Sequence, residues 1–132
     1  MAFGFGDKGI VIREAHFPGR APIDAYGNGG FRFADMSHRG SLLLLPSGVY
    51  GWDVNEGDEL TLAVFERVLA ESGIEFLLLG TGKQMRLVDP DVRAALKQRG
   101  IATDPMGTGA AVRTYNIMLA EQRPVAAALV AV

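Results

Sequence analysis

The residues of this chain that are best suited to bind a ligand lie in two short turns rich in glycine and threonine. Main-chain amides in such turns can form a concave set of donors for an anion, and a lysine at the end of the first turn adds a positive charge. The residues are Gly80, Thr81, Gly82 and Lys83 in the first turn, and Met106, Gly107, Thr108 and Gly109 in the second.

The spacing within these turns limits the chemistry they can support. A Walker A loop has four residues between its first glycine and its Gly-Lys pair. Here a single residue separates Gly80 from the Gly82-Lys83 pair, so the turn is not a Walker A loop. The first turn is equally the tight end of a buried strand. In the second turn, Thr108 is a candidate N-cap of the helix that follows. The free main-chain amides at that helix N-terminus and the positive end of the helix dipole could also attract an anion. Met106 is expected to fill a core gap rather than to contact a ligand.

Another set of residues could contact a protein partner. Arg113, Asn116 and Arg123 fall near one face of a helix predicted over 108–122, where they could bind an acidic partner or a carboxylate. The alternative is a solvated helix face, with the Asn116 amide bonded to backbone groups. Trp52 could anchor an interface or lie half-buried in the core.

The sequence offers little for catalysis or metal binding. The chain has no cysteine, which excludes disulfides, zinc ribbons and thiol catalysis. His16 and His38 have no carboxylate or second histidine at ligand spacing. Ser41 and Ser47 do not match the G-x-S-x-G nucleophile elbow. We expect no metal, no cofactor and no catalytic residue, and the residues favour a non-enzymatic role without deciding it.

Composition predicts one soluble domain over residues 1–132. Hydrophobic residues make up 48% of the 132-residue chain, which is enough for a hydrophobic core that needs no disulfide or metal ion to stabilise it. A net charge of −2 and scattered basic residues argue against nucleic-acid binding. No secretory signal is visible, and the longest apolar run, 125–132, is too short for a membrane helix. We expect a cytoplasmic protein of bacterial type, and its oligomeric state stays open.

The first third of the chain is predicted to be β. Strands are expected at 10–12, 23–26 and 31–33, with the Asn-Gly pair at 28–29 closing a hairpin between the last two. The continuous apolar run 42–45 is typical of a central strand that is buried on both faces.

The rest of the chain alternates helix and strand. A first helix is expected from Leu60, with Asp58 as its cap and Gly73 as its end, and a second opens at Asp89. Strands are expected at 75–79, 101–103 and 125–130, with helices at about 90–99 and 108–122. Right-handed crossovers would make the strands before the two glycine turns neighbours in a mixed sheet, so that both turns share one edge.

Several segments, in order, resemble a known family. They are 27–33, 42–46, Trp52, the strand leading into Gly80-Thr81-Gly82, and 106–129 with its Thr114-Tyr115-Asn116, Glu121 and Arg123. Over about residues 10–129 the chain resembles a small α/β family of largely uncharacterised bacterial and archaeal proteins. Its eukaryotic relatives include a mitochondrial respiratory complex I assembly factor and an adipogenesis-associated protein.

The resemblance implies a fold class and a kind of function. The fold would be a single three-layer α/β domain, with a central mixed sheet, helices on one side and an additional β-plus-α layer on the other. No catalytic residues are agreed for the family. Kinship with an assembly factor favours a non-enzymatic assembly or scaffold protein that acts through protein contacts. The alternative is a module or enzyme that binds a small anion, phosphate or carboxylate with the two Gly-Thr-Gly loops.

Overall fold

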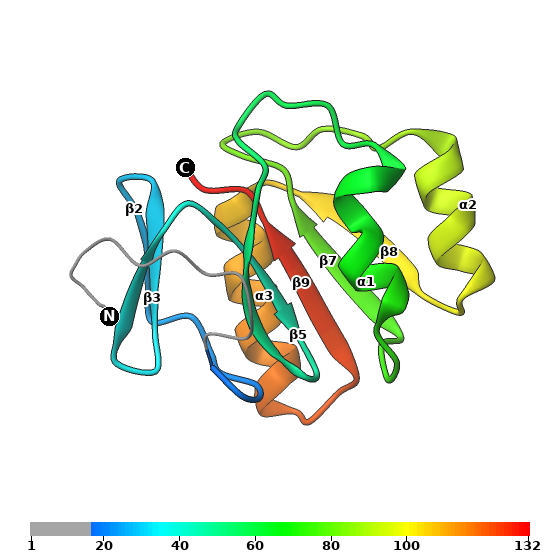
Figure 1. The fold of residues 1–132 in the computed structure, drawn as a ribbon. Helices are drawn as coiled ribbons and strands as arrows, with labels where there is room; N and C mark the ends of the chain where they lie inside the picture. Colours follow the sequence, from blue (N-terminus) through cyan, green and yellow to red (C-terminus); the bar gives the residue numbers. More distant parts are fainter. Residues whose placement is uncertain (1–16) are drawn as a thin grey trace.

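The computed structural model of the protein describes residues 17–132. The strand expected at 10–12 and His16 therefore lie outside the described residues. The centre of the fold is a five-stranded mixed sheet in the order β6-β5-β9-β7-β8 (Figure 1). Its strands are β5 (Ser41–Leu45), β6 (Gly48–Trp52), β7 (Phe76–Gly80), β8 (Ala102–Met106) and β9 (Val125–Leu129).

The middle of this sheet is apolar on both faces. Every residue of β5 and of β9 is buried, as continuous apolar runs require when neither face of a strand meets water. Strand β9 pairs antiparallel with β5 and parallel with β7, so the last strand in sequence occupies the centre of the sheet. The prediction of a central strand at 42–45 is confirmed.

Helices cover one face of the sheet. They are the 3₁₀ turn η1 (Leu62–Phe65), α1 (Glu66–Ala70) and α2 (Pro90–Gln98). Helix α2 begins where the sequence predicts, with Asp89 at its N-cap and Pro90 in its first turn. The expected helix from Leu60 to Gly73 is wrong in extent. Asp58 does not cap it, because its carboxylate accepts a hydrogen bond from Asn55 N at 2.8 Å.

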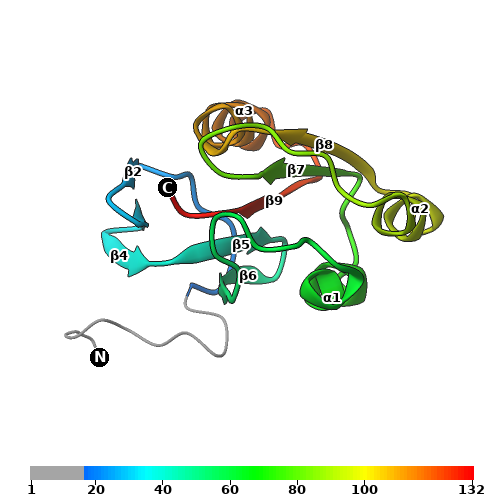
Figure 2. The same ribbon diagram turned by 90° about the horizontal axis from the view of Figure 1, so that it is seen from above.

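The other face carries helix α3 (Thr108–Ala120) and a small antiparallel sheet of β2 (Ala25–Gly27), β3 (Gly30–Phe33) and β4 (Met36–Arg39). Figure 2 shows α3 on the side of the central sheet opposite to α1 and α2. The predicted hairpin is confirmed: Asn28 and Gly29, with φ of 52° and 78°, close β2 onto β3. These positive φ values are those that Asn-Gly turns adopt easily.

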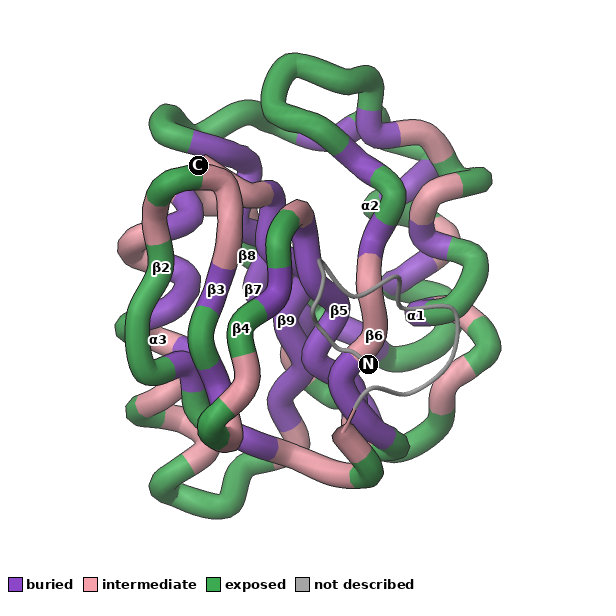
Figure 3. The backbone as a smooth tube through the Cα atoms, turned by 60° about the vertical axis from the view of Figure 1, so that its left-hand side comes forward, coloured by how far each residue is buried: buried purple, intermediate pink, exposed green. Residues whose placement is uncertain are grey.

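Side-chain alternation divides the core into two clusters, one on each face of the sheet. Leu77 and Leu79 pack with the buried faces of α1 and α2, whereas Leu78 packs with α3 and with Phe31 of β3. The resulting purple core lies between the layers in Figure 3. The three-layer α/β arrangement implied by the family resemblance is thus confirmed.

The end of α3 and the presence of two strands also differ from the sequence-based expectation. Helix α3 ends at Ala120, because Gln122 adopts a φ of +59° that a helix cannot continue through. Strands β4 and β6 were not expected, since their short polar or glycine-containing sequences carry a weak alternation signal. Within residues 17–132, the helices are all too short or too polar to reach across a bilayer.

Candidate functional site

The two glycine turns lie side by side at one edge of the central sheet. Strands β7 and β8 are parallel neighbours, and the register pairs Gly80 with Met106. The carboxyl ends of both strands therefore open onto the same edge, where the turns follow. The predicted adjacency of the two strands is confirmed.

The two turns are hydrogen-bonded to each other. Thr81 N donates to Met106 O at 2.9 Å, and Thr108 N donates to Gly82 O at 2.8 Å. The Thr108 hydroxyl accepts from Gly82 N at 3.0 Å and donates to Val130 O at 2.7 Å. Thr108 is fully buried. The turns thus form an interlock, a name we use for Thr81, Gly82, Met106 and Thr108, in which protein groups satisfy one another.

Gly80 allows this close approach. A Cβ at Gly80 would lie 3.0 Å from Thr108 Cα and 3.1 Å from Thr108 Oγ1. Both distances are shorter than ordinary carbon contacts, so a side chain there would push α3 away from β7. The glycine therefore serves helix–strand packing.

A carboxylate does occupy the first turn, and it belongs to this chain. Glu56 Oε2 accepts a hydrogen bond from Lys83 N at 2.6 Å, and it lies 2.8 Å from where a Cβ on Gly82 would stand. The amides of Thr81, Gly82 and Lys83 are all engaged by protein acceptors. An external anion would reach this turn only by displacing Glu56, and its binding there stays a prediction.

The amino end of α3 is covered by β2. Gly107, not Thr108, is the N-cap residue, and it makes no side-chain cap. A Cβ on Gly109 would fall 2.4 Å from the Tyr26 hydroxyl, so this glycine leaves room for the tyrosine. Met106 is half-buried and packs against the core on the α3 side, as expected for a gap-filling residue.

The residues expected on one face of the last helix do different things. The Asn116 amide bonds both backbone groups of Ile23: its Oδ1 accepts from Ile23 N, and its Nδ2 donates to Ile23 O, each at 2.9 Å. Arg113 is exposed on α3. Asn116 therefore ties the chain that precedes β2 to α3, which is the alternative interpretation of this residue.

Arg123 does not share the face of Arg113. It follows the end of α3, with its guanidinium 5.0 Å from the centre of the Phe76 ring. Its Nη1 lies 3.7 Å from Glu121 Oε1, and both side chains are about half exposed. Such exposed pairs contribute little to stability. The expected three-residue face is wrong, because the helix ends before it reaches Arg123.

Trp52 is not an exposed anchor. It is 7% exposed, its Nε1 donates to Val64 O at 2.7 Å, and its ring lies 5.7 Å from that of Phe65. A tryptophan whose ring and N–H are both satisfied inside the protein packs η1 against the sheet. The expectation of an interface around this residue is corrected to a core role.

An exposed apolar segment appears instead in the loop after the first turn. Met85 is 54% exposed and Leu87 is 73% exposed. Arg86, which lies between them, anchors this loop, because its N donates to Thr81 Oγ1 at 2.8 Å and its Nη1 donates to Asp58 O at 3.0 Å. We call Met85 and Leu87 the apolar loop. Two apolar residues in a stretch with neither helical nor strand period were the signal that could have identified it.

The described residues hold no arrangement typical of a catalytic centre. The Ser41 hydroxyl donates to Val54 O at 2.6 Å, and the ring Nε2 of His38 lies 3.1 Å from the main-chain carbonyl oxygen of Ser41, not from its hydroxyl. Burial raises the pKa of Tyr115 to about 12, although the positive charge of Arg20 counteracts part of that shift. Tyr115 is thus a neutral phenol at physiological pH. No group of three or more potential metal ligands occurs within residues 17–132.

Comparison with known proteins shows clear similarity across most of the chain. A family model described as a protein of unknown function (DUF498/DUF598) matches residues 23–130. An uncharacterized protein of Rhodobacter capsulatus is 37% identical over 91% of this chain and 92% of its own length. The crystal structure of an outer membrane protein from Bartonella henselae has a TM-score of 0.84 and 58% identity, covering 88% of this chain and 98% of that one.

A mouse relative carries a functional name. It is NADH dehydrogenase (ubiquinone) 1 alpha subcomplex assembly factor 3, which is 33% identical over 92% of this chain. The match spans 66% of the mouse protein's length, slightly under two thirds. The similarity therefore covers the shared domain and leaves part of the mouse protein without a counterpart here.

Proposed function

This chain belongs to the DUF498/DUF598 family of proteins of unknown function, and from that membership we propose that it is a non-enzymatic assembly or scaffold factor that acts through contacts with other proteins. The observation that carries the proposal is its 33% identity to a mouse protein named as an assembly factor. The cytoplasmic location expected from the sequence is part of the same proposal, and cell fractionation checks it.

The apolar loop is the contact surface that we propose. Burying the side chains of Met85 and Leu87, which are 54% and 73% exposed, would each contribute about 1–2 kcal/mol to binding. Their backbone is anchored through Thr81 and Asp58, and a loop that is already ordered loses little entropy on binding. Arg113, exposed on α3, remains a proposed contact, whereas Asn116, Arg123 and Trp52 are assigned to internal packing or local pairing.

The proposal is tested by affinity purification from the native host with a double variant. Met85→Ser/Leu87→Ser removes apolar surface without touching the core, so the protein should fold normally. We expect a partner retained by the wild type to fall at least about tenfold with the double variant. The matched control is Leu62→Ser, which changes an apolar residue that is 38% exposed on η1 and should leave the partner bound.

Two results would contradict different parts of this proposal. Equal retention by the double variant and the wild type would show that the apolar loop is not the contact surface. Failure of the wild type to retain any protein specifically would remove the assembly role itself.

Anion binding at the paired turns is a second candidate function. Its support is that the first turn already holds a carboxylate, that of Glu56, on the Lys83 amide. The ligand in this candidate is a small phosphate or carboxylate that replaces Glu56, with Gly80–Lys83 and 106–109 as the binding residues. A Glu56 variant, described in the Discussion, tests it.

A further inference from the structure

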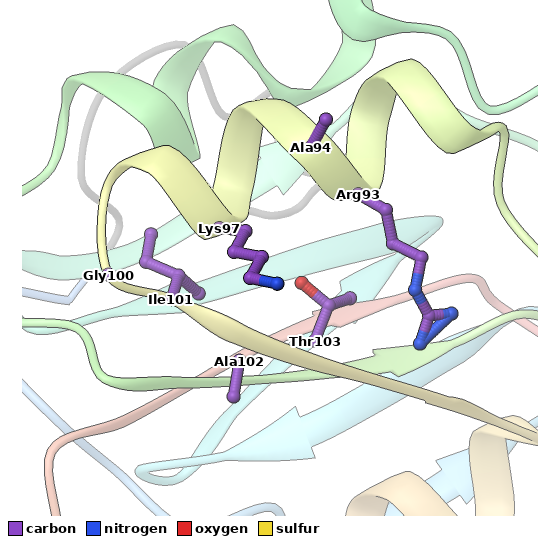
Figure 4. Close-up of a pocket in the computed structure, with 7 residues that line it drawn as sticks. All are labelled: Arg93, Ala94, Lys97, Gly100, Ile101, Ala102 and Thr103. Atoms are coloured by element: carbon purple, nitrogen blue, oxygen red, sulfur yellow. The ribbon is translucent and has the colours of Figure 1, made fainter.

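A cleft of about 600 Å³ lies between helix α2 and strand β8 (Figure 4). It is near the end of α2 and the start of β8, so it is at the opposite end of β8 from the interlock. Its volume is within the range of sites that take small molecules. Among residues 17–132, its lining includes Arg93, Lys97 and Thr103 and no carboxylate residue.

Two positive charges lie in the cleft with no partner among the described residues. Arg93 and Lys97 are both exposed and are one helical turn apart, so they project from the same face of α2 (Figure 4). Within residues 17–132, neither side chain has an ion pair or a hydrogen bond. Like charges at this spacing repel each other slightly, and a bound anion would remove that repulsion.

Thr103 adds a donor beside these charges. Its hydroxyl oxygen is buried and has no hydrogen-bond partner in the described structure. Figure 4 shows this hydroxyl and the amino end of Lys97 pointing toward one another. Buried hydroxyls without a partner are rare and require an explanation. An acceptor atom held by Lys97 would provide one.

The main chain of β8 offers a further donor at the same point. Ala102 N donates to Glu75 O, so the amide of Ala102 faces toward the sheet. Successive amides of a strand face opposite sides, and the Thr103 amide therefore faces outward. Because β8 is the last strand in the sheet order, that side of the strand is open.

The edge of β8 favours a compact ligand over a paired peptide strand. The next outward-facing position after Thr103 is Pro105, which has no N–H to donate. A ladder of hydrogen bonds to an added strand would break there. Asp104 lies on the opposite face of β8 from Thr103 because side chains alternate along a strand, and so it does not place a negative charge in the cleft.

We propose that the α2–β8 cleft binds a small organic oxyanion, a phosphate or carboxylate group held by Arg93 and Lys97 and by the hydroxyl and amide of Thr103. The apolar part of the ligand lies against Ile101, which also lines the cleft. This site is independent of the apolar loop and of the interlock, so it stands or fails separately from the proposed assembly role.

Amide chemical shifts of the full chain, titrated at low ionic strength, test the site. The probes are inorganic phosphate, glycerol 3-phosphate and succinate, which separate phosphate from carboxylate recognition. We expect saturable shifts in residues 97–103 with at least one of the organic probes, and weaker binding as salt is added. Arg93→Gln and Lys97→Gln should each weaken that binding about tenfold, and Thr103→Val about threefold.

Arg32→Gln is the matched control, because it removes one exposed positive charge on β3, outside both candidate anion sites. It should leave the affinity of the cleft unchanged. The proposal is overturned if no probe gives saturable shifts in 97–103, or if Arg93→Gln and Lys97→Gln bind as tightly as the wild type. Saturable shifts at Gly82 and Lys83 with none in 97–103 would likewise overturn it and would support the paired turns instead.

Discussion

The interlock and the α2–β8 cleft lie at opposite ends of strand β8, and both are rich in hydrogen-bond donors. In the interlock and at the neighbouring Lys83 amide, the donors are bonded to acceptors of the same chain, including Val130 and Glu56. In the cleft, Arg93, Lys97 and Thr103 have no such partners among the described residues. Glycine turns therefore locate bends of the backbone but do not reveal whether their amides are available to a ligand.

A pair of isosteric threonine substitutions tests this comparison most strongly. Thr108→Val leaves Gly82 N and Val130 O without their partner, and each buried backbone group left unpaired costs about 1–3 kcal/mol. We expect a loss of about 3 kcal/mol in the free energy of unfolding. Thr103→Val removes a hydroxyl that has no partner and should change stability by less than about 1 kcal/mol. Urea unfolding monitored by circular dichroism measures both. Equal losses would show that the Thr103 hydroxyl contributes as much to stability as the Thr108 hydroxyl does.

A glycine substitution should have a somewhat smaller effect. Gly80→Ala places a methyl group 3.0 Å from Thr108 Cα, and overpacking of this kind costs about 1–3 kcal/mol. Gly107→Ala is the matched control, because its Cβ would come no closer than 3.4 Å to Lys83 O and should cost less than about 1 kcal/mol. Thermal unfolding in parallel separates the two. A control as unstable as Gly80→Ala would show that general strain, and not the α3–β7 contact, controls this region.

Removal of the Glu56 carboxylate should have the smallest effect on stability. It should leave the Lys83 amide without an acceptor, as the donors of the cleft are. Glu56→Ala frees the Lys83 amide at an exposed position, so the loss should stay below about 1 kcal/mol. Inorganic phosphate should then shift the amides of Gly82 and Lys83 at a lower concentration than in the wild type, where it has to displace Glu56. Glu59→Ala, an exposed acid of the same loop, controls for the change in net charge. Absence of a phosphate shift in Glu56→Ala would exclude anion binding at this turn.

Local patterns predicted the backbone framework well. The Asn28-Gly29 hairpin, the buried strand around Leu42–Leu45 and the parallel neighbours β7 and β8 follow from turn chemistry, apolar runs and crossover handedness. Each of these rules depends on residues close in sequence or on a general preference for connections. The layer arrangement was implied by the family resemblance, which covers the same elements.

Local patterns could not predict which groups contact the residues of the predicted sites. Glu56 reaches the Lys83 amide, and the Trp52 N–H reaches Val64 O, through the packing of loops that no periodic pattern specifies. Arg123 does not lie on the expected helix face, because Gln122 has a positive φ and the helix ends before it. Arg93 and Lys97 look like an ordinary solvated helix face until β8 places Thr103 opposite them. Such long-range partners decide which donors remain available.

The central position of β9 has a consequence for synthesis on the ribosome. Strand β9 (Val125–Leu129) separates β5 from β7 in the finished sheet. Until these residues have left the exit tunnel, the β5–β6 hairpin and the β7–β8 pair each present an unpaired strand edge and an uncovered apolar surface. Unpaired edges of this kind favour association between chains. Folding of the central sheet therefore has to wait until β9 emerges, and the two strand pairs made before it need shielding until then.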